Sequence, residues 1–161
     1  MDKVIRALTR VIGAAAALGV VAYGAAAVAT VADVLGRVVG IPVSGVVEMV
    51  QLGVMAGTWL VIPFAFLSGA HVGVDFVFNA MPRPVQVVLA VIIAMGSVVL
   101  VWLMLRYGFD TFRMRTMFGD KSQQLGIPIA VFWYPLLAGL CLSLVAILLN
   151  VTIFLKRPAH V

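Results

Sequence analysis

The stretch VQVVLAVIIAMGSVVLVWLML, residues 85–105, decides the fold class. It has no charged residue, and Gln86 and Ser97 carry its only amide and hydroxyl side-chain groups. A helix of this length is about 31 Å long, which matches the hydrocarbon thickness of a bilayer. A membrane barrel would instead show short segments of alternating polarity. The stretch therefore predicts a helix that crosses a membrane.

Three further apolar runs of similar length lie on either side of this stretch. We therefore expect an all-α membrane protein with four transmembrane helices, at residues 11–32, 46–67, 85–105 and 129–154. Together the four spans take up about half of the chain, which we interpret as a single membrane domain over residues 1–161. The remainder is too short for a soluble catalytic domain.

The composition agrees with this class and excludes several functions. Hydrophobic residues make up 64% of the chain and charged residues 11%, whereas soluble domains carry about 25% charged residues. The net charge of +5 comes from basic residues scattered at helix ends, where they meet lipid headgroups, so we expect no nucleic-acid partner. Two histidines outside the spans and the lone Cys141 predict no haem, metal or other cofactor, and no catalytic motif predicts an enzyme.

The connections between the runs carry their own signals. Asp33 and Arg37 follow the first run, the Gly40–Pro42 stretch predicts a turn, and Ser44 is a candidate N-cap for the second helix. A short segment from His71 to Met81 is expected to lie at the membrane interface. Pro128 suits the first turn of the last helix, where its missing N–H costs little.

The third helix is expected to run on past the hydrocarbon as an amphipathic extension. Arg106, Asp110 and Arg113 would share one face, where Asp110 can pair with either arginine. The other face carries Leu105, Phe109 and Phe112. This extension suits the membrane surface or a partner protein.

Glu48 is the most informative single residue, because a carboxylate near membrane depth is costly and often marks an ion or proton pathway. It lies in the first turn of the second helix, so the alternative is a carboxylate that pairs with a basic residue or faces the headgroups. The second helix also carries Gly53 and Gly57, a GxxxG pair that lets another helix approach closely. His71 and Asp75, four residues apart, would form a loop-anchoring pair rather than a metal site.

Three motifs make the chain resemble the small membrane subunit of tripartite ATP-independent periplasmic (TRAP) transporters, the DctQ-like family. They are Gly45-Val46-Val47-Glu48, His71-Val72-Gly73-Val74-Asp75 with the following Pro82-Arg83, and Ser122-Gln123-Gln124-Leu125-Gly126-Ile127-Pro128. Their order and spacing match a four-helix subunit of this size, so the resemblance covers nearly the whole chain.

The resemblance implies a permease subunit that braces a larger membrane subunit during sodium-coupled uptake of an organic acid or similar solute delivered by a periplasmic binding protein. It implies a bacterial inner-membrane location with both termini in the cytoplasm. The charge rule agrees weakly, with six basic residues on the terminal side against five on the other. The rival interpretation is a self-sufficient proton-coupled exporter that works as a dimer of four-helix chains.

On this interpretation the candidate residues serve assembly rather than chemistry, and the partners are the large membrane subunit, the binding protein and membrane lipids. The candidate interface residues are Glu48, Gln51, Gly53, Gly57, His71, Asp75, Arg83, Arg106, Asp110, Arg113, Arg115, Gly126 and Pro128. We further expect the charged patch of Arg106, Asp110, Arg113 and Arg115 to contact the binding protein or the large subunit outside the membrane.

Overall fold

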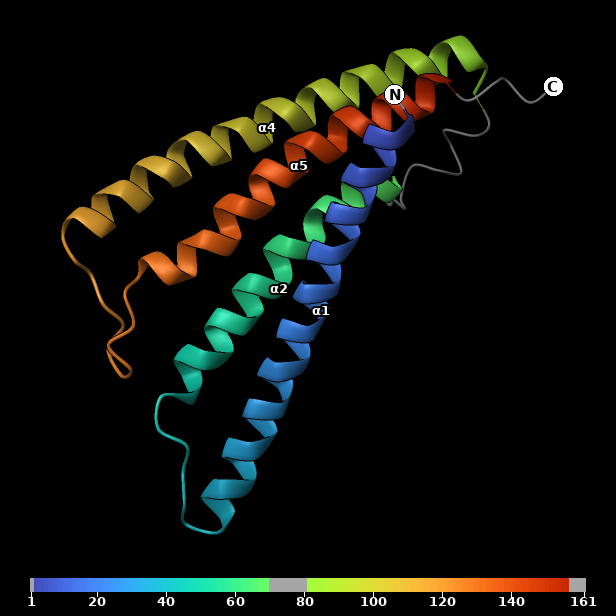
Figure 1. Cartoon of the computed structure of the whole chain (residues 1–161). Helices are drawn as coiled ribbons and strands as arrows, with labels where there is room; N and C mark the ends of the chain where they lie inside the picture. Colours follow the sequence, from blue (N-terminus) through green and yellow to red (C-terminus); the bar gives the residue numbers. More distant parts are fainter. Residues whose placement is uncertain (1, 70–80, 157–161) are drawn as a thin grey trace.

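The computed structural model describes residues 2–69 and 81–156. In this part of the chain lie four long helices: α1 (Asp2–Val38), α2 (Val46–Ser68), α4 (Arg83–Met117) and α5 (Ala130–Lys156), labelled as in Figure 1. All four are long and apolar enough to cross a membrane. The prediction of an all-α membrane protein with four spanning helices is confirmed.

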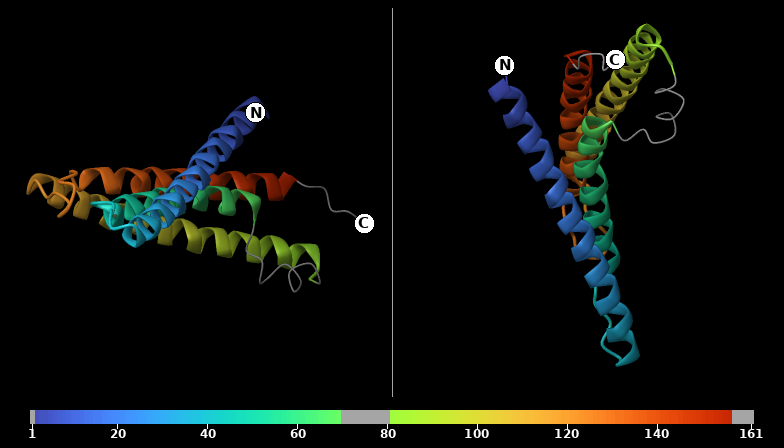
Figure 2. Two further views of the ribbon diagram at one scale, coloured as in Figure 1. Left: turned by 90° about the horizontal axis from the view of Figure 1, so that it is seen from below. Right: turned by 90° about the vertical axis from the view of Figure 1, so that its right-hand side faces the viewer.

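The helices lie side by side in the order α1, α2, α5, α4 and fan out from one end of the molecule (Figure 1). α2 packs between α1 and α5, and α4 packs on the far side of α5. Seen from other directions, the arrangement is open, with α1 and α4 as the outer helices (Figure 2). The start of α1, the start of α4 and the end of α5 lie at one end, and the α1–α2 and α4–α5 connections lie at the other.

Small residues bring α1 and α2 close together. Every seventh residue of α1 from Ile12 through Gly19 and Ala26 to Asp33 is buried, the spacing of a helix seam in a left-handed pair. A Cβ on Gly53 would lie 2.9 Å from the Cβ of Ala26, and one on Gly19 would lie 2.9 Å from the carbonyl oxygen of Gly57. The GxxxG pair of α2 therefore lies against α1.

The contact between α2 and α5 is closer still. A Cβ on Gly139 would lie 2.0 Å from the carbonyl oxygen of Trp59, so the two backbones touch at this point. One turn further along α5, Ser143 is fully buried, and its hydroxyl donates to the Gly139 carbonyl. The adjoining apolar core consists of Leu140 and Ile147 of α5 and Val101 of α4. α2 is thus the central helix, fixed on both sides by glycine contacts.

Several details of the connections differ from expectation. α1 is longer than the expected span of residues 11–32: it begins at Asp2 and ends at Val38, one residue past Arg37. The Asp33 carboxylate bonds both Arg37 and the Val43 N–H and so holds the connection against the helix. Ser44 is not the N-cap of α2. That position is Gly45, whose φ of 75° lies in the left-handed region. α2 therefore has no side-chain cap hydrogen bond at its start.

The other end points were close to the predictions. α4 does continue past Leu105, as far as Met117. α5 begins at Ala130, so Pro128 lies just before its first turn and accepts the Val131 N–H through its carbonyl oxygen. Of the expected interfacial segment, Met81 is described and residues 71–80 lie outside the described residues, as do His71 and Asp75.

Candidate interaction site: polar ties at the helix ends

Glu48 accepts a set of hydrogen bonds that join α2 to the α4–α5 connection, and we call this set the clasp. Its carboxylate accepts hydrogen bonds from the Ser122 hydroxyl at 2.7 Å, the Gln124 N–H at 2.8 Å and the Leu125 N–H at 2.8 Å. Both carboxylate oxygens are used, and the residue is 8% exposed. Hydrogen bonds to an ionised acceptor are roughly twice as strong as neutral ones. The clasp therefore fixes the connection to the start of α2.

The α4–α5 connection is shaped to present those donors. The Ser122 N–H donates to the Ile127 carbonyl at 2.8 Å, and the Ile127 N–H donates back to the Ser122 hydroxyl at 3.0 Å. Between them Gly126 takes a φ of 65°, which a residue with a side chain rarely adopts. Folded back in this way, the stretch turns its Gln124 and Leu125 amides toward Glu48.

Gly45 completes the clasp by letting the connection approach. A Cβ on Gly45 would lie 2.4 Å from the Leu125 side chain, so the absence of a side chain is needed there for space as well as for backbone angle. Two of the three motifs that carry the family resemblance, residues 45–48 and 122–128, therefore meet in space. Of the alternatives for Glu48, pairing with a basic residue is wrong: its partners are a hydroxyl and backbone amides.

A second tie lies at the opposite end, between α4 and α5. The Arg83 guanidinium donates to the Phe154 carbonyl oxygen at 3.2 Å and lies over the Phe154 ring, 4.6 Å from its centroid. A cation at the carboxyl end of a helix is favoured by the helix dipole and here also by the ring. The neighbouring Gln86 amide donates to the Met81 carbonyl at 2.9 Å. Arg83 thus anchors the start of α4 to the end of α5.

Asn150 provides a third tie, between α5 and α2. Its amide nitrogen donates to the Phe66 and Leu67 carbonyls at 2.6 and 3.1 Å. The last carbonyls of a helix have no partner within the helix, so an asparagine from a neighbour satisfies them. The sequence analysis did not single out Asn150 or Phe154, and it named Ser122 only as part of the motif at residues 122–128. A lone polar residue at position 150 in an apolar run was the available signal for the first of these.

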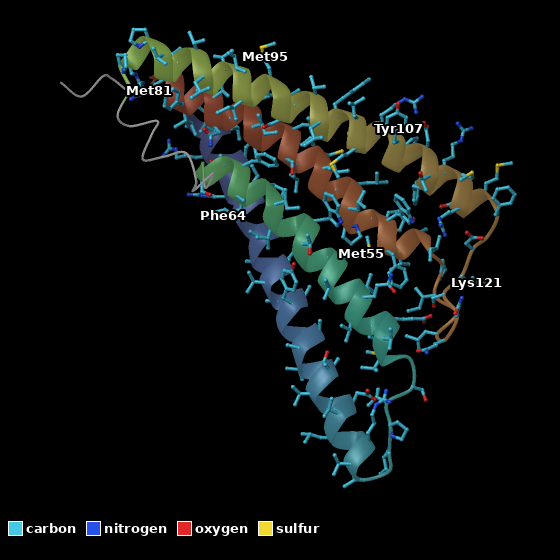
Figure 3. All side chains as sticks on the ribbon, turned by 180° about the vertical axis from the view of Figure 1, so that it is seen from behind. Met55, Phe64, Met81, Met95, Tyr107 and Lys121 are labelled. Atoms are coloured by element: carbon cyan, nitrogen blue, oxygen red, sulfur yellow. The ribbon has the colours of Figure 1, made fainter. Side chains whose placement is uncertain are left out.

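The charged face of α4 is exposed. Arg106 pairs with Asp110, one of the two pairings expected, and Arg115 lies 3.7 Å from Asp120. Uncharged side chains of α4 are exposed too: Figure 3 shows Met95 and Tyr107 pointing outward from the helix, and they are 63% and 67% exposed. Arg113 is exposed as well.

The expected apolar face of the α4 extension is not left for lipid. The Phe112 ring packs on Tyr134 of α5 at 5.8 Å, and Leu105 lies against the apolar core. The reason is that α5 packs beside this part of α4, where a Cβ on Gly108 would lie 3.6 Å from the Leu136 side chain. Phe109, which is 51% exposed, is the member of that face still uncovered.

No cluster of three or more metal-binding side chains occurs among residues 2–69 and 81–156. Asp33, Glu48 and Arg83, which lie near helix ends, are instead bonded to other side chains or to backbone groups. The arrangement has the character of a set of structural ties with exposed outer faces.

The family model for the DctQ component of tripartite ATP-independent periplasmic transporters matches residues 26–156, which include the Glu48 clasp and the ties made by Arg83 and Asn150. The chain belongs to the DctQ family. Searches of curated proteins and of solved structures gave no significant match. As a DctQ component the chain is the small membrane subunit of a TRAP transporter, and this family consists of transporter subunits rather than enzymes.

Proposed function

We propose that this DctQ subunit braces the large membrane subunit of its TRAP importer during sodium-coupled uptake of an organic acid or similar solute. A periplasmic binding protein delivers the solute, and the subunit lies in a bacterial inner membrane with both termini in the cytoplasm. Its role is mechanical: it holds the fixed part of the large subunit while the transporting part moves.

One observation carries the proposal: α2 is locked to its neighbours on both sides, whereas among the helices that the structure describes none covers the outer faces of α1 and α4. A brace has to be rigid within itself and has to offer surface to its partner. The glycine contacts of α2, the Glu48 clasp and the Asn150 tie supply the rigidity. The uncovered outer faces supply the surface.

The same contacts weigh against a self-sufficient exporter. Proton-coupled carriers need a carboxylate that exchanges its partners during the cycle. Glu48 has both oxygens engaged by the α4–α5 connection, and Asp33 has both engaged by Arg37 and the Val43 N–H. These acidic residues hold connections in place.

The purified chain, reconstituted alone in lipid vesicles, should therefore carry out no transport under either a proton or a sodium gradient. The chain together with the large subunit and the binding protein should take up solute when sodium is present outside. Copurification of the large subunit with the tagged chain is the accompanying binding measurement. Transport by the chain alone would refute the bracing role and favour the exporter.

We further propose that the charged patch of α4 receives the binding protein. A transient soluble partner benefits from charge, because electrostatic steering raises the association rate and decays with salt. Replacing Arg113 and Arg115 by glutamate should lower docking and uptake by about tenfold at low ionic strength. Replacing both by lysine keeps the charge and is the matched control. Normal docking and uptake after the reversal would contradict this assignment.

A further inference from the structure

The charges of the chain are divided unequally between the two ends of the molecule. Toward the end with the α1–α2 and α4–α5 connections, the basic residues are balanced by acidic ones, and three arginines there pair with carboxylates. At the other end, where α1 and α4 begin and α5 ends, the described residues include a single acidic residue, Asp2, beside five basic ones: Lys3, Arg6, Arg10, Arg83 and Lys156. This end of the molecule is therefore the electrostatically positive one.

Three of these basic residues form a stripe along the start of α1. Because α1 begins at Asp2, Lys3, Arg6 and Arg10 belong to the same continuous helix as the membrane span. At 3.6 residues per turn they lie within about 60° of one another around the helix axis. All three side chains are exposed, and they lie on the opposite side of the helix from Ile12, which is fully buried. The basic stripe therefore faces away from the helix packing.

The surroundings of the basic stripe have the mixed character of a membrane interface. Val4 and Val11, which alternate with the basic residues along the chain, are 62% and 53% exposed, and Arg10 directly precedes the apolar run. From Lys3 to Arg10 the helix rises about 10 Å, and the headgroup layer on each side of a bilayer is about 5–8 Å thick. Long basic side chains extend toward that layer, so all three cations can reach the phosphate groups.

A phospholipid satisfies both kinds of exposed side chain at this site. Its phosphate pairs with the cations and its acyl chains cover the valines, whereas a water-soluble acidic partner would leave the valines in water. Figure 2 shows the start of α1 standing apart from α4 and α5 in both views, which leaves room for lipid around it. The helix dipole disfavours a cation such as Lys3 in the first turn, and an anion bound alongside relieves this.

We propose that the basic stripe of Lys3, Arg6 and Arg10 selects anionic phospholipids over zwitterionic ones. Both classes carry a phosphate, but the ammonium group of a zwitterionic headgroup cancels its charge. Clusters of basic residues on a helix at the membrane surface attract anionic lipid by about fivefold for each residue. The stripe thereby fixes the start of α1 at the headgroup level. This inference does not depend on the bracing role.

The test is a titration of the purified full chain in detergent with phosphatidylglycerol and with phosphatidylcholine of the same acyl chains. Bound lipid is counted by native mass spectrometry. The unmodified chain should bind phosphatidylglycerol at least about fivefold more tightly, and replacing Lys3, Arg6 and Arg10 together by glutamine should abolish this preference. Replacing Arg6 and Arg10 by lysine should preserve it, because the charge is kept.

The matched control is replacement of Arg106, Arg113 and Arg115 by glutamine, which removes three charges from the other end and should leave the preference unchanged. Equal loss in both triple variants would show a general effect of net charge and overturn the proposal, as would equal affinity of the unmodified chain for the two lipids. A preference that survives loss of the stripe would also overturn it. Circular dichroism verifies folding, and if the stripe variant does not fold, Arg10→Gln alone should lower the preference by about two- to fivefold.

A further arm separates a lipid headgroup from free phosphate. Inorganic phosphate added at constant ionic strength should leave the binding of phosphatidylglycerol unchanged, because it cannot cover the exposed valines. Displacement of the lipid by inorganic phosphate would assign the stripe to a soluble anion and contradict the proposal. Copurification of the large subunit tests the bracing role separately, and its outcome does not alter the lipid measurement.

Discussion

Replacing Gly139 by alanine should destabilise the protein, although the same change elsewhere in a helix is stabilising. The new Cβ would lie 2.0 Å from the oxygen and 2.6 Å from the carbonyl carbon of Trp59. Both atoms belong to the α2 backbone, which cannot shift locally without breaking its own helix. α2 and α5 must therefore move apart, and overpacking of this kind costs about 1–3 kcal/mol.

The control is Gly96→Ala on the outer face of α4, where a Cβ would meet nothing within 4 Å. Alanine in a helix interior is favoured over glycine by about 0.5–1 kcal/mol, so this variant should be neutral or slightly more stable. Unfolding of the purified chain in detergent, followed by circular dichroism, measures both. Equal stability of the two variants would show that α2 and α5 are not in backbone contact.

Replacing Glu48 by glutamine should release the α4–α5 connection from α2. The amide offers one acceptor oxygen and one donating NH₂ group, so one of the positions that now accepts an N–H or hydroxyl would face it with another donor. Amide hydrogen exchange at Gln124 and Leu125, whose N–H groups donate to Glu48, should become at least about tenfold faster, because losing a charge-assisted hydrogen bond is an effect of that order. Uptake by the complete transporter should fall in parallel.

For the exchange measurement Asp110→Asn is the matched control, because it removes a carboxylate from an exposed ion pair that contributes little. Ser122→Ala removes one of the three partners of Glu48 and should give an intermediate exchange rate. The result that contradicts the clasp is unchanged exchange at Gln124 and Leu125 together with an altered sodium dependence of uptake. That pattern would make Glu48 a coupling residue instead.

Much of the fold could be predicted because a membrane imposes one requirement on every span. Each apolar run has to close its backbone hydrogen bonds internally, so run length alone identifies a helix. Residues 85–105 needed no information from the rest of the chain. The continuation of α4 to Met117 followed from the same kind of local reasoning, since its charged residues keep a helical spacing.

The neighbours of each helix could not be predicted, because they depend on which glycine meets which backbone. The spacing of Gly53 and Gly57 indicates a close approach, and nothing local to α2 identifies α1 as the helix that makes it. Glu48 shows the same limit. Its position in a first turn was evident, but its partners lie 74 to 77 residues further along the chain and two of them are backbone amides, which carry no sequence signal.

The long sequence separation within the clasp has a consequence for the biogenesis of this protein. The α1–α2 hairpin can assemble as soon as it leaves the ribosome, since its contacts are internal. Until Ser122 has been synthesised, 74 residues later, Glu48 lacks its hydroxyl and amide partners. Closure of the clasp therefore has to follow the synthesis of α4 and of the connection after it. A chain truncated before Ser122 would keep a carboxylate without these hydrogen-bond donors at the start of α2.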